Sequence, residues 1–482
     1  MIETSKYKKL MMSYFKFYLS VFLLSFFVSV SAQQPVKIFD KKTNTEVLYK
    51  DALKWQDGSV MNDAKVDGVI FIKQNGKYYQ RDINESINVK WFGAKGDGKT
   101  DDTKAFQDML NYLEKIKLNY RVFIPEGEYI ITKALHIKGN NTMPIIQGAG
   151  MRNTILNFSN SADAYCIQFG EKNRNSLSGG LLDLQIRGNG KNDALIIMGS
   201  SPYGVAWCRF ENLYFYNINN GIVEDKNIIF FSSHFSNIHI EKYYGIGMTI
   251  NGGYNTYSGI FIVQPSGQNN KENPQKNLGS KNLAMDIIGG NNSFYDVQSE
   301  DQIKIVGGYN TFNALVIEYI IKSENYKEIP KAAIWVAGAN TIFNKLKIIG
   351  LKSSKFDYLM SVFGPNITIM NAMYEDEGKK DQTIKYPFLP SENSSGVMMN
   401  CILRTTYKLN APEFYKDTKN WSFINMEGSD GKPFSRFNNE GFKMSLKQRD
   451  TFIPEEGTEI FNTTTKTKEF WDGKQWKQIL TK

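Results

Sequence analysis

A short sequence pattern occurs four times between residues 252 and 350, and it constrains the fold more than any other feature of the chain. Each copy opens on glycine, continues through asparagine and closes on an aromatic residue, at 252–257, 289–294, 307–312 and, degraded, 338–343. A strand-like run follows each copy, with an apolar residue three places after the aromatic and, apart from Ser299, another five places after it. Two related lines that begin at Phe210 and Phe235 lengthen the array to at least six copies.

The spacing of these copies predicts a solenoid. Successive aromatic residues are separated by 25, 22, 37, 18 and 31 positions, so the common unit is near 18 to 25 residues and the longer steps carry insertions. A stack of units tolerates such insertions because they lie at turns and leave the stacking undisturbed. The units are strand-like, rich in glycine and asparagine, and without a helical apolar period. This selects a parallel β-helix over leucine-rich or helical repeats.

A second motif carries a resemblance to a known family. Residues 91–106 contain Gly93, Gly96 and Gly98 before an aspartate pair, and related runs follow at 122–129 and 146–150. These segments resemble the opening of the pectate-lyase-superfamily proteins, which include polygalacturonase-like hydrolases, lyases, epimerases and phage tailspikes. The resemblance is dense over residues 90–160 and looser to about residue 350. It implies an all-β fold, a right-handed single-stranded parallel β-helix.

The resemblance does not identify a reaction. Apart from the aspartate pair of this opening motif, the sequence lacks the paired aspartates that mark polygalacturonase-like hydrolases, and it lacks their Gly-His-Gly and Arg-Ile-Lys. No catalytic residue of that family can therefore be transferred by motif.

The beginning of the chain predicts export. Residues 1–32 combine lysines, an apolar core and small residues before Gln33. This pattern is typical of a secretory signal peptide, with cleavage after Ala32. We expect a secreted, periplasmic or cell-surface protein with no membrane span once the signal is removed.

The remaining chain divides into four expected parts. Residues 33–89 form a small N-terminal β module with an Asn75-Gly76 hairpin turn. Residues 90–375 form the β-helix, with a capping helix over 101–117 whose start is capped by Asp101 or Asp102. Residues 376–450 are expected to be an irregular C-terminal extension.

The last part, residues 451–482, reads as a C-terminal β-hairpin module. Two interpretations of it stay open. It is either a trimerising or attachment module, which would make the protein a homotrimer, or a plain capping hairpin.

Charge and cysteine content limit the classes of partner. The net charge of +9 falls to +6 once the signal peptide, with four lysines and one glutamate, is removed. This mild excess fits acidic glycans weakly, and no arginine-rich or basic-aromatic block indicates nucleic acid. Cys166, Cys208 and Cys401 are odd in number and far apart, so they suggest neither disulfides nor zinc.

The repeat also provides a register for the strands. If the aromatic of each coil is position zero, positions zero, three and five point inward and positions four and six point outward. The column at position four contains Tyr214, His239, Phe261, Gln298, Val316 and Lys347. The column at position six contains Tyr216, Glu241, Val263, Glu300, Glu318 and Ile349. An earlier run adds Gln185 and Arg187 to the two columns.

This outward face has the composition of a sugar-binding groove. Aromatic faces stack on pyranose rings, while carboxylates and amides bind hydroxyl groups. We therefore predict a polysaccharide, neutral or acidic, as partner. The insertions at 264–281 and 319–331 are expected to form the walls of the groove. The predicted substrate-binding residues are Tyr214, Tyr216, His239, Phe261, Gln298 and Arg187.

Three glutamates of the outward face are the catalytic candidates. Glu300 and Glu318 are 18 residues apart and should occupy adjacent coils, which suits the roughly 5 to 5.5 Å carboxyl separation of a retaining glycosidase. Glu241 and Glu300, two coils apart, approach the wider separation of an inverting enzyme. A surface column neutralised by Lys304 and Lys322 is the structural alternative.

Three functions remain open from the sequence. A glycoside hydrolase that uses the glutamates, without a metal or other cofactor, is the first. The second is a lyase of the pectate lyase type, which would admit a bound calcium. The third is a non-catalytic glycan-binding adhesin or tailspike-like protein.

Overall fold

The computed structural model describes residues 35–479 except for 41, 56–57, 84–85, 117–120, 140, 264–282, 319–331, 351–357, 377–385, 405–419, 428–432, 437–441, 452–453, 455 and 457. The signal segment 1–32 and the two predicted groove walls lie outside the described residues. The chain divides into two compact units, residues 1–84 and 85–482. No helix of the described residues is long and apolar enough to span a bilayer.

The first unit contains an antiparallel four-stranded sheet within its described residues. Its strand order is β1 (Val36–Asp40), β2 (Thr45–Asp51), β4 (Lys77–Arg81) and β3 (Phe71–Gln74). Asn75 and Gly76 join β3 to β4 with φ of 49° and 78°, the left-handed conformations that an Asn-Gly hairpin turn requires. Short loops join β1 to β2 and β3 to β4, whereas residues 52–76 separate the neighbours β2 and β4.

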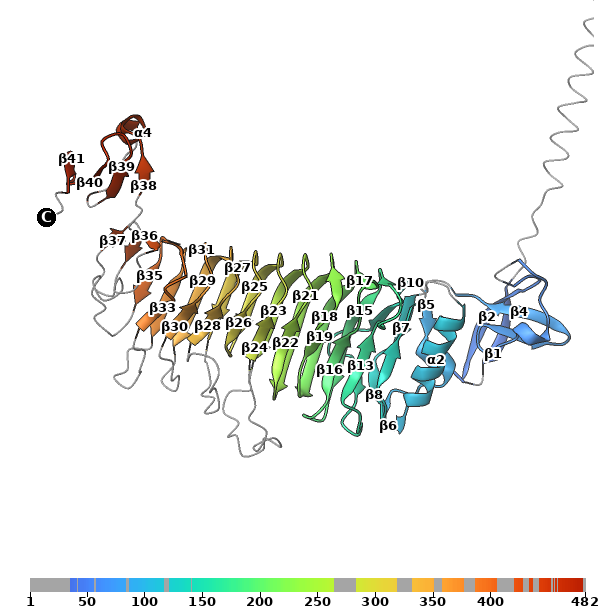
Figure 1. The fold of residues 1–482 in the computed structure, drawn as a ribbon. Coiled ribbons are helices and arrows are strands. Elements are labelled where there is room, and N and C mark those ends of the chain that lie inside the picture. The colour runs from blue at the N-terminus through green and yellow to red at the C-terminus, as the bar shows by residue number, and fades with distance from the viewer. Residues whose placement is uncertain are drawn as a thin grey trace, which may run out of the picture. The chain divides into compact units, whose positions relative to one another are not determined.

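The second unit is a parallel β-helix, as the repeat and the family resemblance predicted (Figure 1). Its longest sheet has 19 strands among the described residues. Each parallel strand is hydrogen-bonded to a strand of the neighbouring coil. The repeat region of this sheet consists of β15 (Gly180–Arg187), β18 (Arg209–Ile218), β21 (His234–Tyr243), β23 (Thr256–Val263), β25 (Ser293–Ser299), β27 (Thr311–Ile317) and β29 (Ile342–Gly350). The coils before it contribute β5 (Ser86–Asn88), β6 (Asp97–Asp101), β7 (Arg121–Ile124), β8 (Gly127–Ile130), β11 (Ile145–Gly148) and β12 (Thr154–Asn157).

Two further sheets close the coils. One has ten strands in the described part of the chain: β9 (Leu135–Ile137), β13 (Tyr165–Phe169), β16 (Asp193–Ile197), β19 (Ile222–Glu224), β22 (Ile246–Ile250), β24 (Leu283–Ile287), β26 (Ile303–Ile305), β28 (Ala332–Val336), β30 (Tyr358–Val362) and β33 (Tyr386–Pro390). The other is shorter and contains β10 (Asn141–Thr142), β14 (Ser176–Leu177), β17 (Gly204–Ala206) and β20 (Ile229–Phe231).

The aromatic residues at position zero form one continuous stack inside the coils. Successive ring centroids lie 4.4 to 5.1 Å apart and the rings are within 12° of parallel. Every ring in the stack is fully buried. The stack, named here the core ladder, consists of Phe210, Phe235, Tyr257, Phe294, Phe312 and Phe343.

The asparagines of the repeat hold the turns between coils. The side-chain oxygens of Asn255, Asn292 and Asn310 each accept the backbone N–H of the preceding coil, at 2.9, 3.0 and 3.0 Å. These side chains are buried, and each amide nitrogen donates to a backbone carbonyl of the preceding coil. Their role is structural, because they satisfy backbone groups that the turn would otherwise leave unpaired.

Helix α2 (Thr103–Ile116) lies at the N-terminal end of the coils (Figure 1). The Asp101 carboxylate accepts the N–H of Thr103 at 2.9 Å and caps the helix start. Asp102 has a different role. Its buried carboxylate accepts the N–H groups of Lys95 and Gly96 and so holds the glycine-containing loop before the helix in place. On the apolar face of α2, the Phe106 ring packs edge-on against Tyr129, with centroids 5.4 Å apart.

The β-helix extends beyond residue 375, where the sequence interpretation ended it. Strands β31 (Ile367–Met370), β32 (Met373–Asp376), β34 (Gly396–Met399), β35 (Ile402–Arg404) and β36 (Trp421–Glu427) continue its parallel pairing. Ile369 and Met398 replace the aromatic residue at position zero and are buried. The repeat is therefore invisible as an aromatic pattern although the coil persists.

After β37 (Pro433–Arg436), the chain forms another four-stranded sheet. It contains β38 (Phe442–Met444), β39 (Glu459–Asn462), β40 (Thr467–Trp471) and β41 (Trp476–Gln478), with the short helix α4 (Leu446–Thr451) after β38. The expected hairpin is β39 with β40. Since β38 pairs in parallel with β39, the module begins before residue 451 and is more than a hairpin.

Candidate functional site

The strand pairing places the predicted outward columns side by side. Tyr214 is in register with Gln185 on one neighbour and His239 on the other, and the column continues through Phe261, Gln298, Val316 and Lys347. Tyr216 is likewise in register with Arg187 and Glu241. The register read from the repeat is thus the register of the sheet.

Tyr214 is the centre of a connected group of side chains on this face. Its hydroxyl donates a hydrogen bond of 2.5 Å to the Glu241 carboxylate. Its ring meets His239 edge-on at 6.5 Å and is tilted against Tyr216 at 6.1 Å. The Arg152 guanidinium lies 4.6 Å from the centroid of the same ring, a cation–π contact. We call Arg152, Tyr214, Tyr216, His239 and Glu241 the upstream cluster.

Burial and charge set the protonation states within this cluster. Burial, reinforced by the hydrogen bond to Glu241, raises the pKa of Tyr214, so its hydroxyl remains a donor. Burial also lowers the pKa of His239; the Arg152 charge acts in the same direction and Glu241 opposes it. His239 is therefore neutral at neutral pH. Its ring rests 5.3 Å from Phe261, and its Nε2 lies 3.2 Å from the Asn237 side-chain oxygen.

Arg187 is engaged by groups that the sequence did not single out. Its Nη1 donates to Glu128 at 2.8 Å, and Asn157 donates to the same carboxylate oxygen at 2.6 Å. Glu128 and Asn157 lie in coils that precede the visible repeat, and Arg152 lies in the turn between β11 and β12. Extending the two columns backwards would have found Glu128 and Asn157, but nothing in the repeat indicates Arg152.

Glu300 and Glu318 each follow the last residue of a strand in adjacent coils. The N–H of Glu300 donates to the Ile262 carbonyl at 3.0 Å, and that of Glu318 donates to the Ser299 carbonyl at 2.8 Å. Adjacent strands of a sheet are about 4.8 Å apart, so the two residues occupy successive rungs. Gln298 donates from its amide to the Glu318 carboxylate at 3.5 Å. Gln298, Glu300 and Glu318 form the second group of candidate residues on this face.

The backbone at Glu300 is anchored in the core. The next residue, Asp301, is buried, and its carboxylate accepts the hydroxyl of buried Tyr243 at 2.5 Å. On the other side of Glu300, the Ser299 hydroxyl donates to the Asp301 carbonyl at 2.6 Å and accepts the Asp301 N–H at 3.1 Å. A side chain on such a fixed turn is well suited to a site that requires a set geometry.

Val263 separates the two groups. It occupies position six between Glu241 and Glu300 and is 8% exposed, so Glu241 is two rungs from Glu300. Lys304, considered as a neutralising cation, instead pairs with Asp286 at 3.3 Å. Lys322 lies outside the described residues. In the part of the chain that the structure describes, no three His, Cys, Asp or Glu side chains gather as a metal site.

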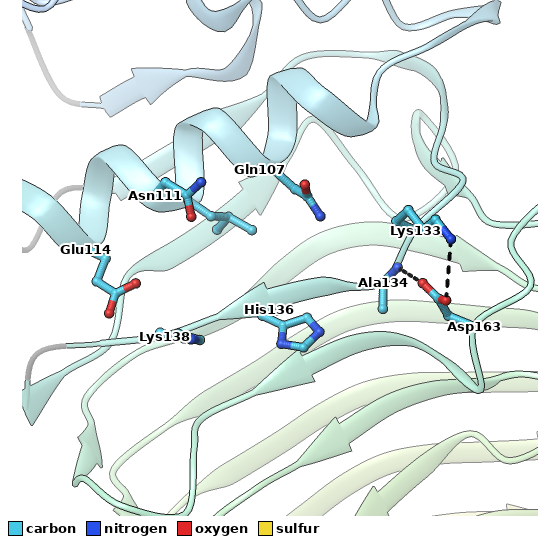
Figure 2. Close-up of a pocket in the computed structure, with 9 residues that line it drawn as sticks. Gln107, Asn111, Glu114, Lys133, Ala134, His136, Lys138 and Asp163 are labelled. Carbon is cyan, nitrogen blue, oxygen red and sulfur yellow. Dashed lines mark hydrogen bonds and ion pairs between the residues drawn. The ribbon is translucent and has the colours of Figure 1, made fainter.

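A separate pocket of about 420 Å³ lies between α2 and β9 (Figure 2). Gln107, Asn111 and Glu114 line it from the helix, and Lys133, His136 and Lys138 from the strand side. Most of its charged groups have protein partners. Lys133 pairs with Asp163 at 4.0 Å, Lys138 with Glu171 at 3.6 Å and Glu114 with Arg174 at 3.3 Å.

Comparisons with known proteins agree with the fold. A family model described as rhamnogalacturonase A/epimerase, pectate lyase-like, matches residues 86–299. The pre-neck appendage protein of Bacillus phage phi29 is 27% identical over 188 residues, which are 37% of this chain and 19% of that protein. Alginate lyase 7 of Azotobacter vinelandii is 38% identical over 117 residues, 22% of this chain and 13% of the lyase.

Among solved structures, the enzymatically active domain of tailspike protein 4 of bacteriophage CBA120 aligns with a TM-score of 0.50 at 12% identity. The alignment covers 83% of this chain and 51% of that domain. This likeness concerns the fold. The chain spans only 10% to 19% of the three phage appendage proteins that it matches. Residues 86–299 thus match a pectate lyase-like family model, and they fold as a right-handed parallel β-helix.

Proposed function

We propose that this protein is an exported enzyme that hydrolyses a polysaccharide bound along the outward face of its β-helix. The observation that carries the proposal is the position of Glu300 and Glu318 on successive rungs. A rung spacing of about 4.8 Å is close to the roughly 5 to 5.5 Å carboxyl separation of retaining glycosidases. In such an enzyme one carboxylate attacks the sugar and the other transfers the proton.

The hydrogen bond from Gln298 suggests which glutamate has which role. The Gln298 amide donates to the Glu318 carboxylate and orients it, so Glu318 suits the nucleophile. Glu300 is then the acid that protonates the leaving oxygen and the base that later activates water.

The upstream cluster supplies binding positions for the same chain of sugars. Tyr216 and Phe261 offer ring faces for stacking, and the neutral His239 offers a nitrogen for a hydroxyl group. Glu241 already accepts the Tyr214 hydroxyl and lies two rungs from Glu300. We therefore propose that Glu241 binds substrate and is not one of the catalytic pair. Arg187 supports this face through Glu128.

Elimination from an acidic sugar is the second candidate, and the upstream cluster favours it. Arg152 could neutralise a sugar carboxylate, His239 could accept the proton next to it, and the Tyr214 hydroxyl could protonate the leaving oxygen. A binding protein without cleavage is the third. The hydrolase needs no cofactor, whereas a lyase of the pectate lyase type would use calcium.

One assay separates these functions. The mature protein is incubated with a panel of acidic and neutral polysaccharides while reducing ends and the absorbance of unsaturated products are followed together. We expect reducing ends alone, which means hydrolysis. Both signals together would mean elimination, and binding with neither would mean an adhesin. Detection of the mature chain, starting at Gln33, outside the cytoplasm would test the proposed export.

A further inference from the structure

A second column of aromatic residues lies at a corner of the coils, three positions before the core ladder. This corner residue has a left-handed backbone in each coil of the repeat, with φ between 52° and 60°. Along successive coils the column reads Trp207, Ser232, Tyr254, Asn291, Tyr309 and Asn340. Aromatic residues therefore occupy every second coil, with a small polar residue between them. We call Trp207, Tyr254 and Tyr309 the corner ladder.

The rings of the corner ladder are exposed. Trp207, Tyr254 and Tyr309 are 55%, 69% and 62% exposed, among the highest values for large apolar or aromatic residues of the described chain. Trp207 has an edge contact with Phe231 at 6.2 Å. Each tyrosine follows a glycine, Gly253 or Gly308, and so cannot pack against the side chain of the preceding residue. These rings add little to the hydrophobic core.

The backbone makes these aromatic residues costly. A left-handed conformation is tolerated by asparagine but is unfavourable for a bulky side chain. Asn291 and Asn340 occupy the same corner in neighbouring coils with φ of 60° and 55°. Since asparagine fits this corner without exposing a ring, neither backbone geometry nor burial explains Tyr254 and Tyr309.

We propose that the corner ladder is a second polysaccharide-binding surface. Its rings are two rungs apart, which is about 9.6 Å. An extended polysaccharide presents the same ring face at every second sugar, a repeat of similar length, so three rings could stack on alternate sugars of one chain. Ser232 and Asn291 lie between the rings and can bind hydroxyl groups. Because the column has no charged residue, it suits the apolar faces of pyranose rings.

This surface is distinct from the candidate site. The core aromatic and a second left-handed bend, at Asn212 in one coil and Asn237 in the next, lie between the corner and the outward columns. The corner ladder rests on the proposal that the ligand is a polysaccharide, but not on any residue of the upstream cluster or on Glu300 and Glu318. It would hold a long chain on the protein while another segment occupies the site.

The test is affinity electrophoresis of the full-length mature protein in gels that contain each polysaccharide of the panel. Tyr254→Asn and Tyr309→Asn install the residue found in neighbouring coils, so folding should be preserved. We expect each change to weaken binding roughly threefold to tenfold. Tyr295→Asn is the matched control, because Tyr295 is 42% exposed and is aligned with Asn313 of the next coil. Its binding should equal that of the unchanged protein.

Several outcomes would overturn the proposal. One is binding that is insensitive to both tyrosine changes but abolished by Tyr216→Ala, which would place all binding at the outward face. Another is sedimentation showing that the tyrosine changes dissociate an oligomer, which would make the corner a subunit interface. Failure of the unchanged protein to bind any polysaccharide would also overturn it. Loss of binding in the tyrosine variants of a protein that cleaves nothing would support the ladder and contradict only the hydrolase.

Discussion

The core ladder and the corner ladder are two aromatic columns only three positions apart in the same coils. The core ladder has a ring in each of six successive coils, and each ring is buried and stacked on the next at 4.4 to 5.1 Å. The corner ladder has a ring in every second coil, and its rings are more than half exposed. The core ladder lies on extended strand, whereas the corner ladder lies on left-handed backbone.

This difference shows how to separate scaffold from function in a repeat. A residue that recurs in every coil and is buried has a sufficient explanation in packing. A residue that recurs in alternate coils, at a cost in backbone energy and with no gain in burial, requires another explanation. The predictions below test this separation, from the largest expected effect to the smallest.

Removal of a ring from the core ladder should have the largest effect. Phe294→Ala would leave a cavity between Tyr257 and Phe312 and should lower the free energy of unfolding by about 3 to 5 kcal/mol. Urea denaturation followed by circular dichroism measures this. A loss below about 1 kcal/mol would mean that the ladder is not the scaffold.

The one hydroxyl-bearing member of the core ladder should make stability depend on pH. Tyr257 bonds at 3.0 Å to Glu224, which is buried and also accepts the N–H groups of Asn251 and Gly252 at 2.8 and 2.6 Å. Burial raises the pKa of Glu224 from 4.5 to about 7. The folded protein therefore retains a proton that the unfolded chain releases between these values.

The sign follows from this linkage. The contribution of Glu224 to stability is complete below pH 4.5 and is lost as the pH rises to about 7, a decrease of about 3 kcal/mol. Glu224→Gln should remove this slope, so the stability of the variant relative to the unchanged protein should be greater at pH 8 than at pH 5. Unfolding experiments across this range measure it; a parallel pH profile in the variant would contradict the prediction.

The anchor beneath Glu300 should give an intermediate effect. Tyr243→Phe keeps the ring but leaves the buried Asp301 carboxylate without this hydrogen bond, so we expect a loss of about 1 to 3 kcal/mol. If Glu300 is catalytic, the cleavage rate should fall as well because its turn is loosened. Tyr165→Phe, on a partly exposed hydroxyl far from Glu300, is the control. Unchanged stability would show that the bond does not hold this turn.

A change in the corner ladder should have the smallest effect on stability. Tyr309→Asn relieves left-handed strain and removes a ring that is 62% exposed, so the free energy of unfolding should stay constant or rise by up to about 1 kcal/mol. The same urea experiment as for Phe294→Ala measures it. A loss comparable to that of Phe294→Ala would show that the two ladders share one structural role.

The sequence predicted the features that repeat. The aromatic at position zero, the asparagines of the turns and the alternation of inward and outward residues follow from one local pattern, so the β-helix and the two outward columns could be read directly. Features that occur once were not visible. Arg152 reaches Tyr214 from a turn, and Glu224 and Asp301 are acids placed in the core by contacts between coils.

The end of the β-helix was misplaced for a related reason. The interpretation relied on an aromatic at position zero, but Ile369 and Met398 fill the same space as well. These last coils share another residue, an asparagine two places after position zero, and Asn371, Asn400 and Asn425 form a chain of side-chain hydrogen bonds. Asn212 and Asn237 occupy the same position in two early coils, but the four coils between have other residues there, so no single residue marks every coil.

The rate of polysaccharide cleavage in glutamate variants tests the central claim most directly. We predict that Glu300→Gln and Glu318→Gln each reduce the initial rate at least 100-fold without changing binding in the affinity gel. Glu375→Gln is the matched control, because Glu375 lies in the same outward column but is paired with Lys347 at 3.7 Å, and it should cleave normally. Near-normal cleavage by either of the first two variants would contradict the assignment.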